Sequence, residues 1–249
     1  MLLSGKNAVI YGAGGSIGSA VASAFASEGA RVHLAGRTPE SLDRTASQIR
    51  SAGGAAETAL VDALDDRAVD EHAEAVAAAA GSLDISVNLI SHGAVQGTPL
   101  AEMSADDFER PVRTAVRTTF LTSRAAARHM IRQRSGVILI FGGYGDPVPG
   151  VGGLQVAFGA LESLRRGLAC ELGPHGIRVV TLQTGGIPET LPQDFDGRRL
   201  ITDAIVGRTM LGRAATLADV GNVAAFAASD QARTITAAAI NITCGSVAG

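Results

Sequence analysis

Residues 7–36 read NAVIYGAGGSIGSAVASAFASEGARVHLAG. An apolar, β-prone run at 7–11 is followed by a glycine-rich turn, an Ala-rich segment at 16–27 and a second apolar run at 31–35. This order predicts a strand, a helix and a parallel strand, the unit from which α/β domains are built. A glycine-rich turn that ends a first strand and opens a helix is typical of sites where backbone amides approach a phosphate.

The same alternation continues along the rest of the chain. A later apolar run predicts a strand that ends near 62. Further apolar runs predict strands at 85–91, 137–141, 177–183 and 237–243. The segments between them have helical spacing, including 66–80, 104–133, 154–172 and 218–229. Strands that alternate with helices predict parallel pairing with right-handed crossovers. We therefore expect an α/β fold, a Rossmann-type doubly wound parallel sheet of about seven strands with helices on both faces.

The chain shows no internal linker, so residues 1–249 are expected to form a single dinucleotide-binding domain. The segment 184–211 differs from the rest because it is rich in Gly, Pro and charged residues. It follows a predicted strand at its carboxyl end, where ligands bind in such sheets. We expect this segment to be a substrate loop or lid.

The composition limits the possible partners. The net charge is −3, aromatic residues make up 4% of the chain and Trp is absent. A chain with this composition gives no reason to expect nucleic acid as a partner. We find no signal peptide, no apolar stretch long enough for a membrane helix and no metal-ligand motif, and the two cysteines, Cys170 and Cys244, are expected to be free thiols. A cytoplasmic location follows as a prediction.

A basic residue follows the second predicted strand. An acidic side chain at that point would hold the ribose 2′-hydroxyl of NAD(H), but the chain has Arg37 there. A guanidinium at this position can instead meet the 2′-phosphate of NADP(H). The expected cofactor is therefore NADP(H).

These motifs resemble those of the short-chain dehydrogenase/reductase family. Where that family has Thr-Gly-x-x-x-Gly-x-Gly, residues 11–18 read YGAGGSIG, so the outer glycines match while Tyr11 and Ser16 depart from the pattern. Residues 168–172 (LACEL) and 176–179 (GIRV) also read like the family, and the resemblance runs from about Gly5 to Gly245. It implies that the cofactor contacts are Gly12, Gly15, Ser16, Ile17, Gly18, Arg37, Asp62, Ala63, Asn88, Gly185 and Ile187.

Typical members of this family catalyse proton transfer with a tetrad of Asn, Ser, Tyr and Lys. When the sequence is aligned on the LACEL segment, the Tyr position holds Leu154 and the Lys position holds Phe158. The Ser position holds Gly143 and the Asn position holds Ala115. The chain has a single lysine, Lys6, and no Tyr precedes it, so no register restores the Tyr-x-x-x-Lys pair.

Three functions stay open at this point. The preferred one is an atypical NADP(H) oxidoreductase that takes its proton from His92, Tyr144 or water, on a small-molecule substrate that the sequence does not identify. The second is a non-redox enzyme on the same scaffold, such as a cyclase, lyase or isomerase. The third is a catalytically silent protein that binds a nucleotide or a partner. The fold does not decide among them.

The resemblance also implies an assembly. Family members usually form tetramers by packing two long helices, which here correspond to about 104–133 and 154–172. Both segments are rich in Ala, which permits close approach of helices. We therefore expect a homotetramer.

Overall fold

The structure is a computed structural model and describes residues 1–143 and 148–246. The described residues form one seven-stranded sheet in the order β3-β2-β1-β4-β5-β6-β7. All neighbouring strands are parallel. The strands are β1 Asn7–Tyr11, β2 Arg31–Gly36, β3 Ala55–Leu60, β4 Ile85–Asn88, β5 Gly136–Gly142, β6 Ile177–Gln183 and β7 Ala238–Asn241. The predicted fold class is confirmed.

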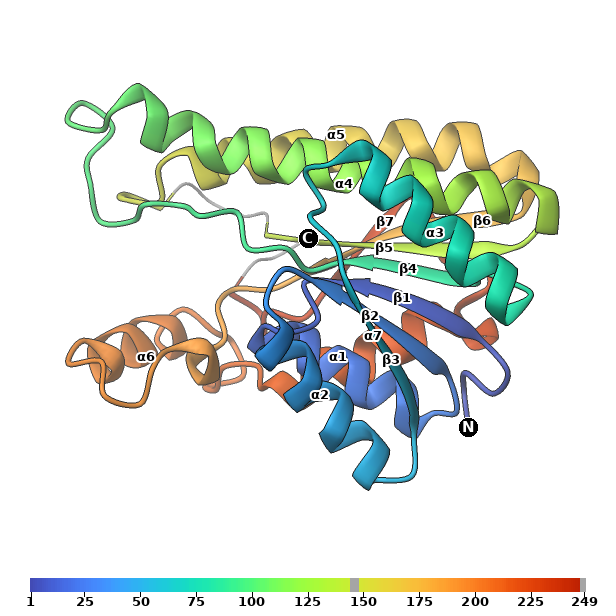
Figure 1. Ribbon diagram of the computed structural model, residues 1–249. Helices are drawn as coiled ribbons and strands as arrows, with labels where there is room; N and C mark the ends of the chain where they lie inside the picture. Colours follow the sequence, from blue (N-terminus) through green and yellow to red (C-terminus); the bar gives the residue numbers. More distant parts are fainter. Residues whose placement is uncertain (144–147, 247–249) are drawn as a thin grey trace.

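Helices cover both faces of the sheet, as Figure 1 shows. One face carries α3 Asp66–Ala80, α4 Ala105–Gln133 and α5 Gly153–Leu172, and the other carries α1 Ser16–Ser27, α2 Pro39–Ser51 and α7 Leu217–Ala228. Two apolar cores result, one on each side of the sheet. The central strand β1 serves both, because Ile10 faces the first core and Tyr11 the second. No helix among the described residues is long and apolar enough to cross a membrane.

Three helices on these faces are capped at their N-termini by side chains that accept hydrogen bonds from backbone amides. Asp65 accepts hydrogen bonds from two backbone amides at the start of α3, and Ser104 accepts one at the start of α4. Thr216 and Asp219 form a reciprocal capping box on α7. Helices α1 and α2 differ, because Gly15 and Thr38 at their N-cap positions make no side-chain cap hydrogen bond. Their first amides are therefore available to a ligand.

Strand β4 is shorter than the sequence predicts. It ends at Asn88, whereas the apolar run continues to Ser91. The Asn88 side chain explains the stop: its Oδ1 accepts a hydrogen bond from the Ile90 amide at 3.0 Å, which turns the backbone out of the sheet. Its Nδ2 donates to Thr118 and Thr119 on α4. Asn88 thus fixes the exit of β4 against α4.

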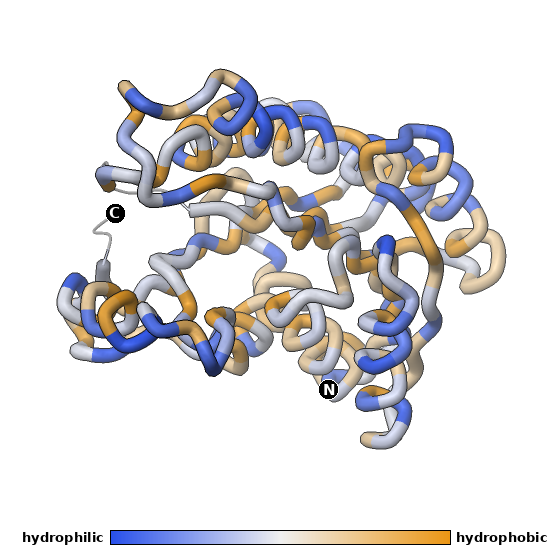
Figure 2. Tube along the Cα trace, turned by 60° about the vertical axis from the view of Figure 1, so that its left-hand side comes forward, coloured by the Kyte–Doolittle hydropathy of each residue, from blue (hydrophilic) through white to orange (hydrophobic). Residues whose placement is uncertain are grey.

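The segment 184–211 holds two helices that the sequence interpretation missed, η2 Pro188–Thr190 and α6 Arg198–Val206. Figure 1 shows α6 projecting to one side of the layered body, and Figure 2 shows hydrophobic and hydrophilic residues alternating along this lobe. Several large apolar side chains on it are exposed: Phe195, Leu200, Ile201, Met210 and Leu211.

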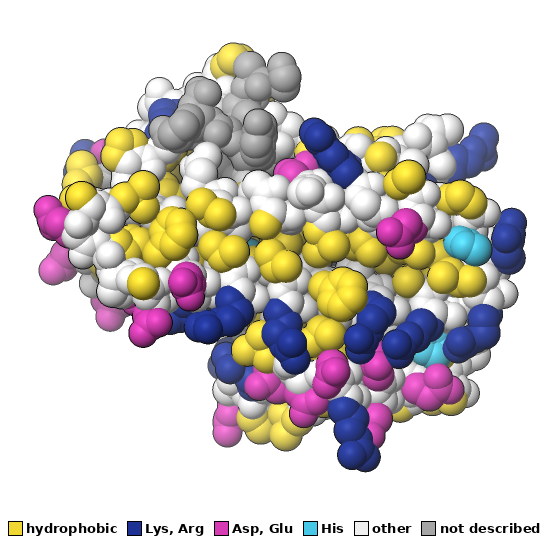
Figure 3. Space-filling view, turned by 90° about the horizontal axis from the view of Figure 1, so that it is seen from above, with side chains coloured by type: hydrophobic (Ala, Val, Ile, Leu, Met, Phe, Trp, Pro, Cys, Tyr) yellow, Lys and Arg dark blue, Asp and Glu magenta, His cyan; other side chains and the backbone are white. Residues whose placement is uncertain are grey.

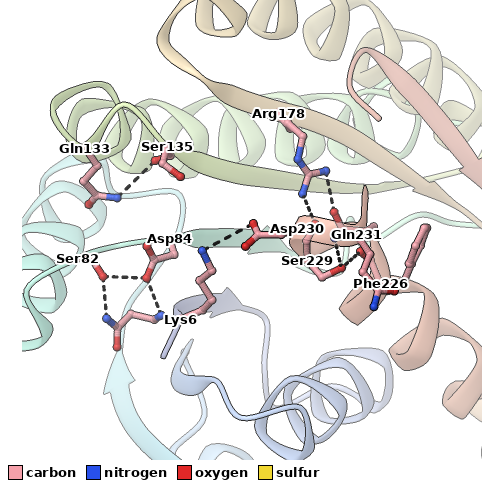
Figure 4. A network of polar contacts seen from close by, with 12 residues as sticks. Lys6, Ser82, Asp84, Gln133, Ser135, Arg178, Phe226, Ser229, Asp230 and Gln231 are labelled. Carbon is pink, nitrogen blue, oxygen red and sulfur yellow. Dashed lines mark hydrogen bonds and ion pairs between the residues drawn. The ribbon is translucent and has the colours of Figure 1, made fainter. Parts of the chain in front are cut away.

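Polar contacts join the elements at the amino-terminal edge of the sheet (Figure 4). Lys6, directly before β1, forms an ion pair with Asp230 at 3.9 Å. Arg178 on β6 donates to the carbonyls of Ala227 and Ser229 at 2.8 and 3.0 Å, which fixes the C-terminal end of α7. The only lysine of the chain therefore lies at the edge opposite to the carboxyl ends of the strands.

Beneath α3, a cluster of buried rings should make stability depend on pH. Tyr11 and His72 meet edge to face at 5.8 Å, and burial lowers the pKa of His72 to about 4 and also lowers that of the neighbouring His33. Both imidazoles are neutral in the folded state, whereas unfolding lets them take up protons below their ordinary pKa. The stability that depends on neutral His72 is complete above pH 6.5 and is lost as the pH falls toward 4.

Between pH 7 and pH 5 the free energy of unfolding is expected to decrease in the unmutated protein. In a His72→Phe variant we expect this decrease to be smaller by about 2 kcal/mol. The phenyl ring keeps the contact with Tyr11 but takes up no proton. Urea denaturation at the two pH values measures the difference. The control is Met130→Leu, a change of similar volume at a fully buried position of α4 that carries no titratable group, which should leave the pH dependence unchanged. Equal pH dependence in all three proteins would contradict the prediction.

Candidate functional site

A cleft of about 640 Å³ opens at the carboxyl ends of β1, β2, β3 and β4. Its floor is the turn between β1 and α1, where Gly12 has φ +82° and a Cβ would lie 2.5 Å from the Leu89 carbonyl oxygen. A Cβ at Gly18 would lie 2.2 Å from the Gly12 oxygen. These two positions therefore require glycine, and the backbone at the mouth of the turn stays uncovered.

The cleft receives residues from four more places in the chain. Gly36, Arg37, Thr38, Ser41 and Leu42 come from the end of β2 and the start of α2, and Asp62, Ala63 and Leu64 follow β3. Residues 89–93 follow β4. Helix α4 closes the cleft with Arg110, Arg113, Thr114 and Thr118.

Five of the eleven predicted cofactor contacts line this cleft. Gly12, Gly15, Arg37, Asp62 and Ala63 line it. Ser16 lines an adjoining hollow together with Gly15, and Ile17 is half-buried beside the core.

Three predicted contacts lie elsewhere. Asn88 lies below the cleft, bonded to α4, and Gly185 and Ile187 are not among the residues that line it. Ile187 is buried in the core on the α1 side of the sheet.

The charges of the cleft favour an anion. Arg37 is exposed, and among the described residues neither it nor Arg113 has an ion-pair or hydrogen-bond partner. Arg110 is engaged with Asp107 at 2.6 Å and also reaches the Gly93 carbonyl. The uncapped N-termini of α1 and α2 add the positive ends of two helix dipoles. This donor set fits the diphosphate and the 2′-phosphate of NADP(H).

The sequence interpretation did not find Thr38, Ser41 or the residues from α4. A signal for the first two was present, since hydroxyl groups follow Arg37 directly on the chain. No local signal marked Arg113, because only the tertiary packing of α4 brings it to a cleft built from other elements.

The four tetrad positions lie beside this cleft, on α4, α5 and the end of β5. Ala115 is fully buried, and Leu154 and Phe158 occupy the first two turns of α5. The Phe158 ring covers Gly143, since a Cβ there would lie 2.7 Å from Phe158 Cε2. The same ring meets His92 edge to face at 6.1 Å. An aromatic contact thus occupies the space between β5, α5 and the loop after β4.

Two side chains, His92 and Tyr144, were predicted to supply a proton, and the structure describes only the first. Burial lowers the pKa of His92 to about 4, so the imidazole is neutral at pH 7 and does not act there as an imidazolium donor. Tyr144 lies outside the described residues. No group of three or more potential metal ligands occurs in the part of the chain that the structure describes.

The match to a known family covers nearly the whole chain. The family model described as enoyl-(acyl carrier protein) reductase matches residues 12–246. This chain belongs to the short-chain dehydrogenase/reductase family. The predicted resemblance is confirmed, and with it the place of the chain in a family of oxidoreductases.

Curated and solved relatives match this chain over most of their length. The chain is 31% identical over 229 residues to gluconate 5-dehydrogenase of Gluconobacter oxydans, covering 91% of this chain and 89% of that protein. It is 32% identical over 240 residues to D-threitol dehydrogenase of Mycolicibacterium smegmatis, covering 95% and 90%. A short-chain dehydrogenase from Burkholderia cenocepacia, solved in complex with NADP, superposes with a TM-score of 0.86 at 28% identity, covering 99% of each chain.

Proposed function

We propose that this protein binds NADP(H) in the cleft at the carboxyl ends of the strands. The observation that carries the proposal is the unpaired Arg37 beside the uncapped N-terminus of α2. The NADP complex of the Burkholderia cenocepacia relative supports it. When bound, the cofactor supplies a nicotinamide ring that can exchange a hydride. The glycine turn and Arg37 would hold the diphosphate and the 2′-phosphate.

The test is a calorimetric titration of the purified protein with NADPH. Saturable binding with one site per chain supports the proposal, and no heat of binding at millimolar NADPH contradicts it.

We further propose that the protein is an atypical member, without the proton-transfer machinery of the family. Leu154 and Phe158 have no titratable group, and Gly143 and Ala115 carry no hydroxyl or amide to orient a substrate. Lys6 is held at the opposite edge of the sheet by Asp230. Among the predicted donors, His92 is neutral at pH 7, so a redox reaction here would draw its proton from Tyr144 or water.

A catalytically silent, nucleotide-binding role is the second candidate. The observation that favours it is the packing of Phe158 on Gly143 and His92, which fills the usual reaction space with hydrocarbon. Nothing in the described cleft favours a non-redox enzyme over these two.

The segment 184–211 is proposed as the lid of this site, within a single domain over 1–249. Its support is its place after β6 and the exposed apolar side chains on and around α6. A lid of this composition would cover an apolar ligand surface. The cytoplasmic location remains a prediction from the sequence.

We also propose a homotetramer that uses the outer face of α4 and α5. Figure 3 shows a band of hydrophobic side chains across this face, flanked by a row of basic side chains. Phe120 on α4 and Val156 on α5 are exposed by 44% and 48%. Small residues continue along α5 at Gly159, Ser163 and Gly167, where another helix can approach closely.

The double variant Phe120→Asp/Val156→Asp is therefore expected to lower the molar mass measured by light scattering, from a tetramer to a dimer or monomer. Burying two carboxylates in an apolar contact is unfavourable by several kcal/mol. The control is Leu60→Asp, which places a carboxylate at another exposed apolar site, at the end of β3. An unmutated protein that is already monomeric at micromolar concentration would refute the assembly.

A further inference from the structure

The cleft fits one half of the cofactor better than the other. Its described lining comprises the glycine turn, the residues after β2 and β3, residues 89–93 and one side of α4. In this family's arrangement those are the contacts of the adenosine, its 2′-phosphate and the diphosphate. The family resemblance places the Lys position, Phe158, and the glycine at position 185 beside the nicotinamide half, with Gly143 and Ile187 next to them. None of these four residues lines the described cleft.

These four residues do not line the cleft because they pack against other parts of the protein. Phe158 covers Gly143 and contacts His92, as described above. A Cβ at Gly185 would lie 2.3 Å from Ser246 Oγ, so the C-terminal segment closes over this position. Ile187 is only 5% exposed. Among the described residues, the protein's own side chains thus pack on Gly143 and Gly185, at the nicotinamide end of the groove.

The charges have the same asymmetry. Arg37, a cleft arginine without a described partner, lies at the adenosine end together with the open N-termini of α1 and α2. At the nicotinamide end, the Lys position that grips the ribose in typical members holds Phe158. In the part of the chain that the structure describes, the unpaired Arg37 and the open helix N-termini thus lie at one half of the ligand.

We propose that the cleft recognises the adenosine 2′-phosphate 5′-diphosphate half of NADP(H) and leaves the nicotinamide half without a fixed site. This inference rests on the proposed NADP(H) binding and names the part of the ligand that provides it. Nucleotides that end in this half, with or without nicotinamide, form the ligand class. The oxidation state of the nicotinamide has no effect on affinity.

Titration calorimetry on the full-length protein tests this with three probes: NADPH, NADP⁺ and adenosine 2′-phosphate 5′-diphosphate, which is the recognised half without nicotinamide and its ribose. We expect the three dissociation constants to agree within about threefold. A nicotinamide half held by even two hydrogen bonds would give NADPH an advantage of about tenfold or more over adenosine 2′-phosphate 5′-diphosphate. That advantage would overturn the inference while leaving the proposed function intact. Failure of all three probes to bind would overturn both.

A second measurement does not depend on affinity. Nicotinamide fluorescence of NADPH changes when a protein encloses the ring, so we expect the emission maximum of bound NADPH to stay at its value in water. A blue shift in the unmutated protein would overturn the inference. In Phe158→Ala, which opens the space beside Gly143, we expect the shift and an NADPH advantage to appear. The control is Phe226→Ala, a partly exposed ring on α7 away from the cleft.

Discussion

Supplied with NADPH and a panel of ketones and aldehydes, the protein is expected to oxidise the cofactor at least about 10²–10⁴-fold more slowly than a family member that carries the tetrad. The reason is the loss of the general acid, since Leu154 has no proton to give and Phe158 cannot tune one. The decrease in absorbance at the nicotinamide band measures the rate. Secondary alcohols with NADP⁺ test the reverse direction.

The matched experiment rebuilds the tetrad with Ala115→Asn, Gly143→Ser, Leu154→Tyr and Phe158→Lys. The order in which these substitutions are introduced affects stability, because a Cβ at position 143 would lie 2.7 Å from the Phe158 ring. We expect Gly143→Ser alone to lower stability by about 1–3 kcal/mol, and the same change beside Phe158→Lys to have a much smaller effect. Weak carbonyl reduction by the quadruple variant would support the assigned positions.

Ordinary carbonyl reduction by the unmutated protein would contradict the prediction. If that activity also survived Tyr144→Phe and His92→Gln, the assignment of the tetrad positions itself would be wrong.

Replacing Arg37 with Ala is expected to abolish a preference for NADPH over NADH. A guanidinium that meets a phosphate through charge-assisted hydrogen bonds contributes on the order of 1.5–3 kcal/mol, which is about 10- to 150-fold in the dissociation constant. Titration with both cofactors measures the ratio, which should fall to near one in the variant. NADH binding itself should change little, because it has no 2′-phosphate.

The control is Arg31→Ala, which removes an exposed arginine from the other end of the same strand. It changes the net charge equally but lies away from the cleft, so the NADPH preference should persist. That preference should also weaken as salt rises, because Arg37 is exposed. Equal affinity of the unmutated protein for NADPH and NADH would refute the role of Arg37.

Much of the fold was predictable because its signals are local. The apolar run 7–11, the glycine turn and the Ala-rich segment gave β1 and α1 at their observed bounds. Ser104 with Asp107 marked the start of α4, and the Asp107 amide does donate to Ser104 Oγ. Helix α6 was missed because its neighbours are Gly, Pro and charged residues, and only the helix itself has an amphipathic pattern.

The site was only partly predictable, because its parts depend on tertiary contacts. Residues that follow strands β1, β2 and β3 could be placed at one edge from the pattern alone. The contributions of Arg113 and Thr118 required the position of α4. Asn88 was expected on the cleft, but its amide is used in ending β4 and holding α4. Asn88 thus shows that a residue which matches a cofactor motif can have a structural role, here in fixing the backbone after β4.

The contact between Phe158 and Gly143 also limits how the sequence can change over time. While the ring is present, any side chain larger than hydrogen at position 143 meets it, so a serine introduced there first is destabilising. A smaller residue introduced first at position 158 instead leaves a void against Gly143 and His92. That intermediate is less stable and gains no activity. The residues at positions 143 and 158 are therefore coupled, and a serine at 143 is accommodated best when the residue at 158 changes with it.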